Sequence, residues 1–182
     1  SGRALTEELL KTLEYSNVPS STIDGLTEHL KKHSLEVEDS LAYSEVRLQS
    51  AAYIDGRPTQ RITSPQITLT TGNSFTPSAS IKMRIDGKEI ESKSEGVGVF
   101  DALVNAVLTG INGDFGKKIK FAGWEEISVN GGQDAEAYAR VYMKYGDEMY
   151  VGRARHTDIA IAAGLAAVNA INSIYAINKP PV

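Results

Sequence analysis

The chain has no cysteine among its 182 residues, and no continuous apolar run in it approaches the roughly 20 residues that span a bilayer. Without cysteine it can form neither disulfides nor a thiolate metal site, which excludes the disulfide-stapled secreted mini-domains. The N-terminus carries neither an apolar signal core nor a basic targeting run. These absences predict a soluble, cytoplasmic protein with no membrane partner.

An excess of positive charge is also missing. The chain carries 19 Lys and Arg against 23 Asp and Glu, which gives a formal net charge of −4 and a sequence pI of about 5.4. Nucleic-acid binders use a positive surface to attract phosphate groups. The charge balance therefore disfavours a nucleic-acid partner.

Side chains suited to catalysis are scarce, since there are only three histidines and no GxSxG-like motif. His29 and His33 have the i, i+4 spacing of a pair of metal ligands. Leu30 occupies the position where a metalloprotease has its glutamate, and no third ligand lies nearby in the sequence. We interpret the pair as helix surface and predict neither a catalytic nor a metal site.

Residues 1–58 have the pattern of a small helical linker subdomain. Apolar residues at helical spacing predict a first helix from Ala4 to Tyr15 and a second from Ser21, where Ser21 and Asp24 resemble a capping box, to His33. A third helix is predicted within 36–56, with Asp39-Ser40 as its cap, although Val46-Leu48 and Tyr53-Ile54 are equally compatible with strands.

From Arg61 onward, apolar residues alternate with polar ones at period two, which is typical of strands. Asp86-Gly87 separates two alternating runs and favours a type I′ hairpin turn, because both central positions of that turn need positive φ. A third strand leads through Gly96 and Gly98 into an apolar helix from about Val99 to Ile111. The unit therefore reads βββα.

The same unit recurs sixty residues later, with Ile81 matching Val141 and Met83 matching Met143. The match also places Ile67-Thr68-Leu69 on Ile127-Ser128-Val129, and a gap of three residues then aligns Asp101 with Asp158 at the heads of the two helices. The predicted fold is α+β, with two pseudo-repeated units at about 61–111 and 118–175 in a second domain, residues 59–182. A three-stranded sheet leaves one apolar face, so the units are expected to need each other or a second copy.

The glycine-containing turn before the first long helix is the strongest candidate for a binding site. Gly96, Val97 and Gly98 place backbone N–H groups at a helix N-terminus, where the helix dipole favours an anion such as a carboxylate. The flanking residues are apolar. An amino acid with an apolar side chain matches both features, although the glycines are equally compatible with a tight turn and no ligand.

Three motifs occur in order along the second domain: Gly96-Val97-Gly98-Val99-Phe100-Asp101-Ala102, then Gly131-Gly132-Gln133-Asp134-Ala135, then Gly152-Arg153-Ala154-Arg155-His156-Thr157-Asp158-Ile159. An Ala-rich helix that ends in Asn169-Ala170-Ile171-Asn172 follows them. Together they resemble the C-terminal allosteric domain of 2-isopropylmalate and citramalate synthases. The resemblance covers about Ile67 to Tyr175, and the first residues resemble the segment that joins the catalytic barrel of that family to its linker subdomains.

The resemblance implies a homodimer that binds the end product as feedback inhibitor near the dimer interface, leucine in isopropylmalate synthases or isoleucine in citramalate synthases. It also implies a catalytic barrel elsewhere in the same polypeptide, which uses a divalent metal and acetyl-CoA. This chain alone is expected to have no cofactor and no synthase activity. The effector residues that the resemblance implies are Gly96, Val97, Gly98, Phe100, Asp101, Phe121, Trp124, Asp134, Ala135 and Tyr138.

One departure from the family pattern bears on the effector. The family has Pro and then a small aliphatic residue where this chain has Val99 and Phe100, and the bulkier Phe100 could narrow the pocket. Two alternatives to an effector sensor stay open. One is a purely structural dimerisation module whose pocket Phe100 has closed, and the other is a double-stranded RNA-binding domain, because βββα cores also occur there. The acidic composition and the lack of a basic cluster at a helix start argue against RNA.

Overall fold

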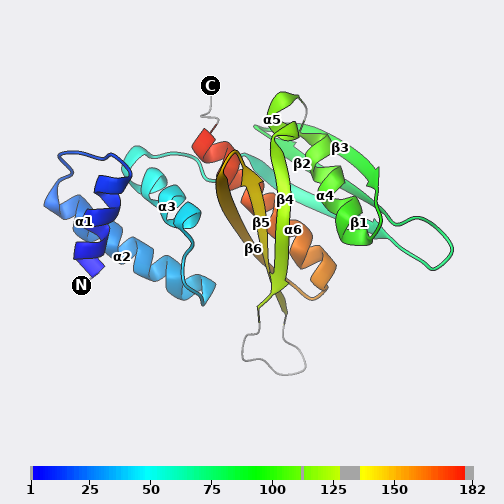
Figure 1. Cartoon of the computed structure of the whole chain (residues 1–182), viewed down its shortest axis with the longest axis horizontal. Coiled ribbons are helices and arrows are strands. Elements are labelled where there is room, and N and C mark those ends of the chain that lie inside the picture. The colour runs from blue at the N-terminus through cyan, green and yellow to red at the C-terminus, as the bar shows by residue number, and fades with distance from the viewer. Residues whose placement is uncertain (1, 112, 128–135, 179–182) are drawn as a thin grey trace. The chain divides into compact units, whose positions relative to one another are not determined.

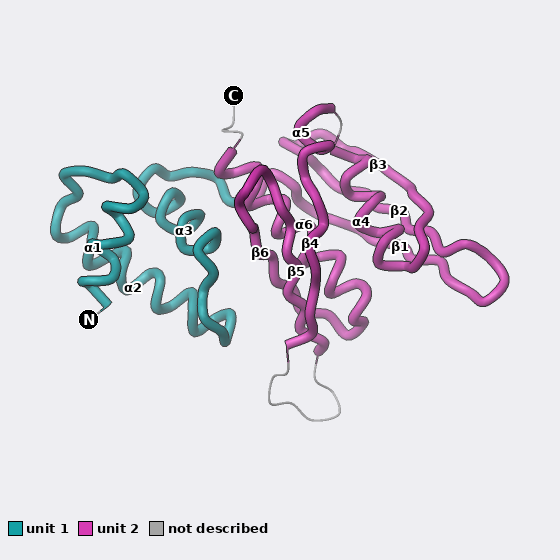
Figure 2. The backbone as a smooth tube through the Cα atoms, in the orientation of Figure 1, with its two compact units in different colours: residues 1–59 teal, residues 60–182 magenta. Residues whose placement is uncertain are grey.

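The computed structural model describes residues 2–111, 113–127 and 136–178. The chain forms two compact units, residues 1–59 and 60–182 (Figure 2). The boundary lies within one residue of the position expected from the sequence. Helices alone make up the described part of the first unit, whereas the second contains both sheets and helices.

The first unit contains three helices, α1 (Gly2–Thr12), α2 (Ser20–Val37) and α3 (Tyr43–Asp55) (Figure 1). The strand alternative for the third segment was wrong, because the whole of Tyr43–Asp55 is helical. The expected boundaries also shift, since α2 continues to Val37 and α3 begins only at Tyr43.

Both predicted helix caps in this unit were wrong. Helix α2 begins at Ser20, directly after Pro19, and no side chain caps it. Ser21 is therefore inside the helix, and the Asp24 carboxylate pairs instead with the Arg3 guanidinium. Helix α3 begins after Ala42, whose N–H donates to the Glu45 carboxylate at 3.0 Å, so Asp39-Ser40 is not its cap.

The second unit contains two βββα repeats, which confirms the predicted fold class (Figure 1). Each repeat has an antiparallel sheet in the order of the sequence, followed by a helix. A single-turn helix that was not predicted from the sequence, α5 (Asp114–Lys117), lies between them. The first repeat comprises β1 (Ile62–Thr70), β2 (Ser78–Ile85), β3 (Lys88–Glu95) and α4 (Val99–Gly110), and the second β4 (Ile119–Glu126), β5 (Ala137–Tyr145), β6 (Glu148–His156) and α6 (Ile159–Asn178).

The turn between β2 and β3 has the backbone that its sequence predicts. Asp86 has φ +51° and Gly87 has φ +81°, so both central residues are in the left-handed region that a type I′ turn requires. Such a turn follows the natural twist of the two strands, and it sets their register. The hairpin prediction is confirmed.

The predicted alignment of β1 with β4, the first strands of the two repeats, was wrong by three residues. Ile67 pairs with Ile81 in the first sheet, whereas Trp124 pairs with Val141 at the equivalent place in the second. Trp124 is thus the counterpart of Ile67. The cause is the connection from β4 to β5, which spans residues 127–136 and is longer than the connection over residues 71–77. Of the residues first matched to this strand, Ser128 and Val129 lie outside the described part of the chain.

The proposed gap before the two long helices was also wrong. Helix α4 begins at Val99 and α6 at Ile159, so the helices keep the offset of sixty residues. Asp158 therefore corresponds to Gly98 and precedes its helix, whereas Asp101 lies inside the first turn of α4.

The two long helices and the inner faces of the two sheets form the core of the second unit. Helix α4 packs on β2 and β3, α6 packs on β5 and β6, and the two helices also contact each other. By length and composition α6 could cross a membrane, contrary to the expectation that no segment of the chain reaches that length. Most of α6 is buried inside the fold, as in the core helix of a globular domain.

Candidate effector pocket

The two glycines of the turn before α4 have different structural roles. A Cβ on Gly96 would overlap the Ala102 backbone nitrogen, so this position needs glycine for close packing. Gly98 is the N-cap of α4 with φ −136° and ψ 171°, which any residue can adopt, and a Cβ there would meet nothing within 4 Å. Between them, Val97 is 97% exposed. A ligand could approach the backbone at Gly98.

The N-termini of the two long helices differ in how their backbone N–H groups are satisfied. At α6, the Asp158 carboxylate accepts hydrogen bonds from Ala160 N at 2.8 Å and Ile161 N at 3.1 Å. At α4, Gly98 has no side chain to cap the helix, and the Asp101 carboxylate accepts from Val97 N at 3.0 Å. The first N–H groups of an α-helix have no partner within the helix. Those of α4 therefore remain available to an external acceptor.

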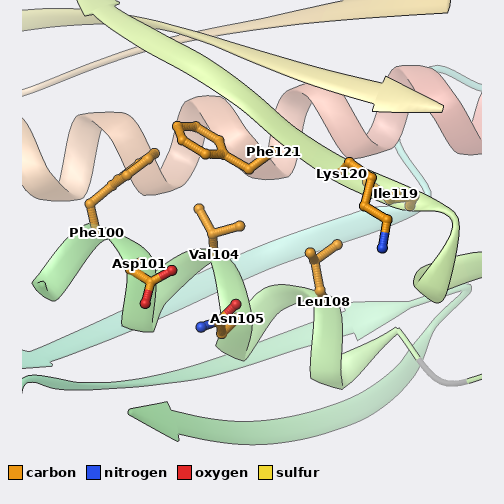
Figure 3. Close-up of a pocket in the computed structure, with 8 residues that line it drawn as sticks. All are labelled: Phe100, Asp101, Val104, Asn105, Leu108, Ile119, Lys120 and Phe121. Atoms are coloured by element: carbon orange, nitrogen blue, oxygen red, sulfur yellow. The ribbon is translucent and has the colours of Figure 1, made fainter. Parts of the chain in front are cut away.

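A pocket of about 280 Å³ lies between α4 and the beginning of β4 (Figure 3). Small-molecule sites have volumes of roughly 300 to 1,000 Å³, so this pocket suits a small ligand. Its wall is largely apolar, with a carboxylate from Asp101 and an ammonium group from Lys120 among the lining groups. The lining residues are Phe100, Asp101, Val104, Asn105, Leu108, Ile119, Lys120 and Phe121.

Three of the aromatic residues expected at the site lie together. The Phe100 ring contacts the Phe121 ring edge-on, with centroids 5.0 Å apart, and the Trp124 ring at 5.5 Å. Phe121 and Trp124 are each 42% exposed. Phe100 thus packs into an aromatic wall of three rings beside the pocket, of which Figure 3 shows Phe100 and Phe121.

Tyr138 lies on the other face of its sheet. Trp124 pairs with Val141, and Tyr138 stands an odd number of residues before Val141, so alternation along the strand directs it away from the pocket. The Tyr138 hydroxyl lies 3.2 Å from Arg153 Nη1, and the Arg155 guanidinium lies 4.4 Å from its ring centroid. Two further predicted residues, Asp134 and Ala135, lie outside the described residues.

The face that holds Tyr138 is rich in arginine and tyrosine. The Glu125 carboxylate accepts hydrogen bonds from Arg140 Nε at 2.7 Å and from the Tyr142 hydroxyl at 2.6 Å. Burial, and then this hydrogen bond, raise the pKa of Tyr142. This face is a paired polar surface, distinct from the apolar pocket.

Comparison with known proteins identifies the second unit. The profile of the LeuA allosteric (dimerisation) domain matches residues 36–175. The chain belongs to this family. The match includes α3 and extends to the last turn of α6, so it covers both repeats of the LeuA domain.

The similar curated proteins carry two synthase names. A protein provisionally named an (R)-citramalate synthase from Archaeoglobus fulgidus is 26% identical over 176 residues, which are 96% of this chain and 35% of that protein. A provisionally named 2-isopropylmalate synthase from Methanopyrus kandleri is 33% identical over 110 residues, which are 60% of this chain and 22% of that protein. The 2-isopropylmalate synthase of Solidesulfovibrio magneticus is 33% identical over 98 residues, which are 54% of this chain and 18% of that protein. The chain thus spans about a fifth to a third of these relatives.

Sequence reasoning missed five residues of the LeuA-domain pocket. Val104, Asn105 and Leu108 follow Phe100 and Asp101 at helical spacing, so the periodicity of α4 could have found them. Ile119 and Lys120 come from β4, and no local signal pairs that strand with α4.

The structure provides other partners for the histidines weighed as metal ligands. His29 Nε2 lies 2.8 Å from Gln49 Oε1, and the His29 ring packs against Tyr53. His33 Nδ1 lies 3.9 Å from the Glu36 carboxylate. Among the described residues, no group of three or more His, Cys, Asp or Glu side chains could hold a metal ion.

Proposed function

We propose that this LeuA domain is the regulatory part of a 2-isopropylmalate synthase-like acyltransferase and binds leucine as feedback inhibitor. The observation that carries the proposal is the apolar pocket beside the uncapped N-terminus of α4. An amino acid presents a carboxylate, an ammonium group and an apolar side chain, and the region offers a chemical partner to each.

In the proposed complex, the leucine carboxylate accepts hydrogen bonds from the N–H groups near Gly98. The ammonium group lies beside Asp101, with Asp134 as the second acidic candidate. The apolar side chain enters between Phe100, Val104 and Phe121. Tyr138 is left out of this complex because it lies on the other face of its sheet.

The proposal extends to the assembly and to the whole protein. The family description includes dimerisation. Phe121 lines the pocket and Trp124 packs against Phe100 beside it, and a second copy could cover these two half-exposed rings. We propose a cytoplasmic homodimer. The catalytic barrel of the same polypeptide would hold the divalent metal and use acetyl-CoA, and neither cofactor is proposed for this chain.

Isothermal titration calorimetry with leucine and isoleucine tests the proposal. We expect leucine to bind more tightly. Preference for isoleucine would favour a citramalate synthase sensor, and binding of neither amino acid would favour the purely structural dimerisation module. Sedimentation at tens of micromolar should show a dimer, and a monomer would contradict the proposed assembly.

Gly98→Val separates a ligand site from a simple turn. The variant adds a branched side chain where the structure leaves open space and no unusual φ, so the domain should fold. The side chain should block the backbone N–H groups and weaken leucine binding at least tenfold, or about 1.4 kcal/mol. The control is Leu35→Ala, at an exposed apolar residue of α2 that does not line the pocket, and it should bind normally. Equal binding by Gly98→Val and the parent would place the ligand elsewhere.

A further inference from the structure

A buried asparagine of α6 holds the start of the first sheet. Asn172 is 2% exposed. Its Oδ1 accepts hydrogen bonds from Arg61 N at 2.9 Å and Ile62 N at 2.7 Å, and its Nδ2 donates to Ile62 O at 3.0 Å. The side-chain amide of Asn172 thus satisfies three backbone groups of two adjacent residues that are more than a hundred positions away in the sequence. We call these three hydrogen bonds the Asn172 joint.

The side chain of Arg61 secures the same place from a second direction. Its guanidinium forms two hydrogen bonds with the Asp86 carboxylate in the β2–β3 turn, at 2.8 and 2.5 Å. It also lies 4.9 Å from the centroid of the Tyr175 ring on α6. Arg61 is the second residue of the second compact unit. The joint therefore fixes the point at which the chain enters the second unit.

The same helix contacts α4 next to the pocket. A Cβ on Gly164 would overlap Cδ2 of Leu103, so the absence of a side chain lets α4 and α6 pack closely there. Leu103 is fully buried and directly precedes Val104, which lines the pocket. Gly164 and Asn172 are eight residues apart on one continuous helix, a rise of about 12 Å.

Helix α6 is held as one body along this stretch. A Cβ on Gly152 of β6 would overlap the Ala166 carbonyl oxygen, so the helix rests directly on the strand backbone. Asn169 Nδ2 adds a hydrogen bond to Arg153 O at 2.7 Å. A displacement at the α4 contact would consequently be passed along α6 as a whole, because close-packed elements do not deform locally.

We infer that α6 couples the effector pocket to the entry point of the chain, with the Asn172 joint as its output contact. This inference rests on the proposed function, since an effector must occupy the pocket. Binding shifts α4, the Leu103–Gly164 contact transmits the shift to α6, and the joint changes the stability of the backbone at Arg61 and Ile62. A regulatory domain needs such a contact on the segment that leads to the rest of its polypeptide.

Amide hydrogen exchange of the complete chain, followed by NMR with and without saturating leucine or isoleucine, tests the coupling. In the parent protein, the effector should change exchange at Arg61 and Ile62 at least threefold. In Asn172→Ala, calorimetric affinity should stay within threefold of the parent, whereas the effector should no longer change exchange at these two amides. The matched control is Asn73→Ala, an exposed asparagine in the connection from β1 to β2, which should behave as the parent does.

The outcomes separate the coupling from the proposed function. Binding by calorimetry without any change at Arg61 and Ile62 overturns the coupling alone, and so does an undiminished change in Asn172→Ala. Failure of both amino acids to bind overturns the proposed function and the coupling with it. Should Asn172→Ala not fold, Arg61→Met removes the contacts with Asp86 and Tyr175 but keeps the backbone bonds, and it should reduce the effector-dependent change at least by half.

Discussion

The two βββα repeats share one plan and differ where their helices begin. Each first strand has a register shift in the corresponding stretch, and each helix starts sixty residues from its counterpart. Yet Asp158 caps α6 with its own carboxylate, whereas Gly98 leaves α4 uncapped. The N-terminus of α6 is capped by its own side chain, whereas that of α4 leaves its first N–H groups open to an external acceptor. The difference teaches that the repeat provides the scaffold and that the missing cap in one copy provides the candidate site.

The repeats also differ where each helix rests on its third strand. Ser92 pairs with Ile81, and Gly152 pairs with Val141, so these two residues correspond. Ser92 Oγ donates a hydrogen bond to Ala106 O at 2.8 Å, whereas Gly152 brings its bare backbone against the equivalent carbonyl of Ala166. The second helix is thus packed more closely than the first.

Gly152→Ala should have the largest effect among substitutions that probe the difference between the repeats. The added methyl group overlaps backbone atoms of α6 that cannot rotate away, and overpacking of this kind costs about 3 kcal/mol of unfolding free energy. The corresponding Ser92→Ala loses one hydrogen bond, at a cost of about 1 kcal/mol. Urea unfolding measures both. Equal losses for the two variants would mean that the repeats do not differ in helix packing.

Much of the plan of the second unit could be predicted from the sequence. Alternation at period two identified the strands, and the Asp86-Gly87 pair identified its turn, because both are local signals. The register between paired strands, in contrast, is not set by a local signal. The longer connection before β5 moved Trp124 opposite Val141, and no pattern within β4 itself indicates the three-residue slip.

The residues of the candidate site also divide into those that a local sequence signal indicates and those that depend on long-range packing. Phe100 and Asp101 were found through the glycine motif, and the α4 face that continues from them follows from helical periodicity. The contribution of Ile119 and Lys120 depends on long-range packing, as do the bonds of Asn172 to Arg61 and Ile62. Tyr138 was assigned to the site from its position in a motif, but the pairing of β5 with its neighbours places its side chain on the opposite face of the sheet.

Gly98→Asp tests the comparison directly by giving α4 the cap that α6 has. The backbone at Gly98 is extended and the space around it is open, so the new carboxylate should cap the N–H groups of α4 and stabilise the domain by about 0.3 kcal/mol. The same carboxylate should repel the ligand and weaken leucine binding at least tenfold, about 1.4 kcal/mol. Thermal unfolding and calorimetry measure the two effects. A stabilised variant with unchanged affinity would show that the α4 N–H groups do not bind the ligand.

Asp158→Ala is the reverse change and should have an intermediate effect. Removing the cap leaves the N–H groups of Ala160 and Ile161 without their present acceptor, which should cost about 1 kcal/mol of unfolding free energy. Leucine affinity should not change, because the pocket lies at the other helix. The measurement is urea unfolding, paired with calorimetry. A loss of binding as large as that of Gly98→Asp would place the effector at the second repeat.

Phe100→Leu should have the smallest effect, and it concerns the one departure of the pocket from the family pattern. Phe100 lines the pocket and packs against Phe121 and Trp124. Its counterpart at the offset of sixty is Ala160, so only the first repeat carries a ring here. A leucine side chain is smaller than the ring and should widen the pocket, which should strengthen leucine binding roughly threefold, or about 0.6 kcal/mol. Phe75→Leu, at an exposed residue in the connection from β1 to β2, is the control and should bind as the parent does. Calorimetry decides between two roles: tighter binding would identify Phe100 as a partial obstruction, and weaker binding would identify it as a wall that the ligand contacts.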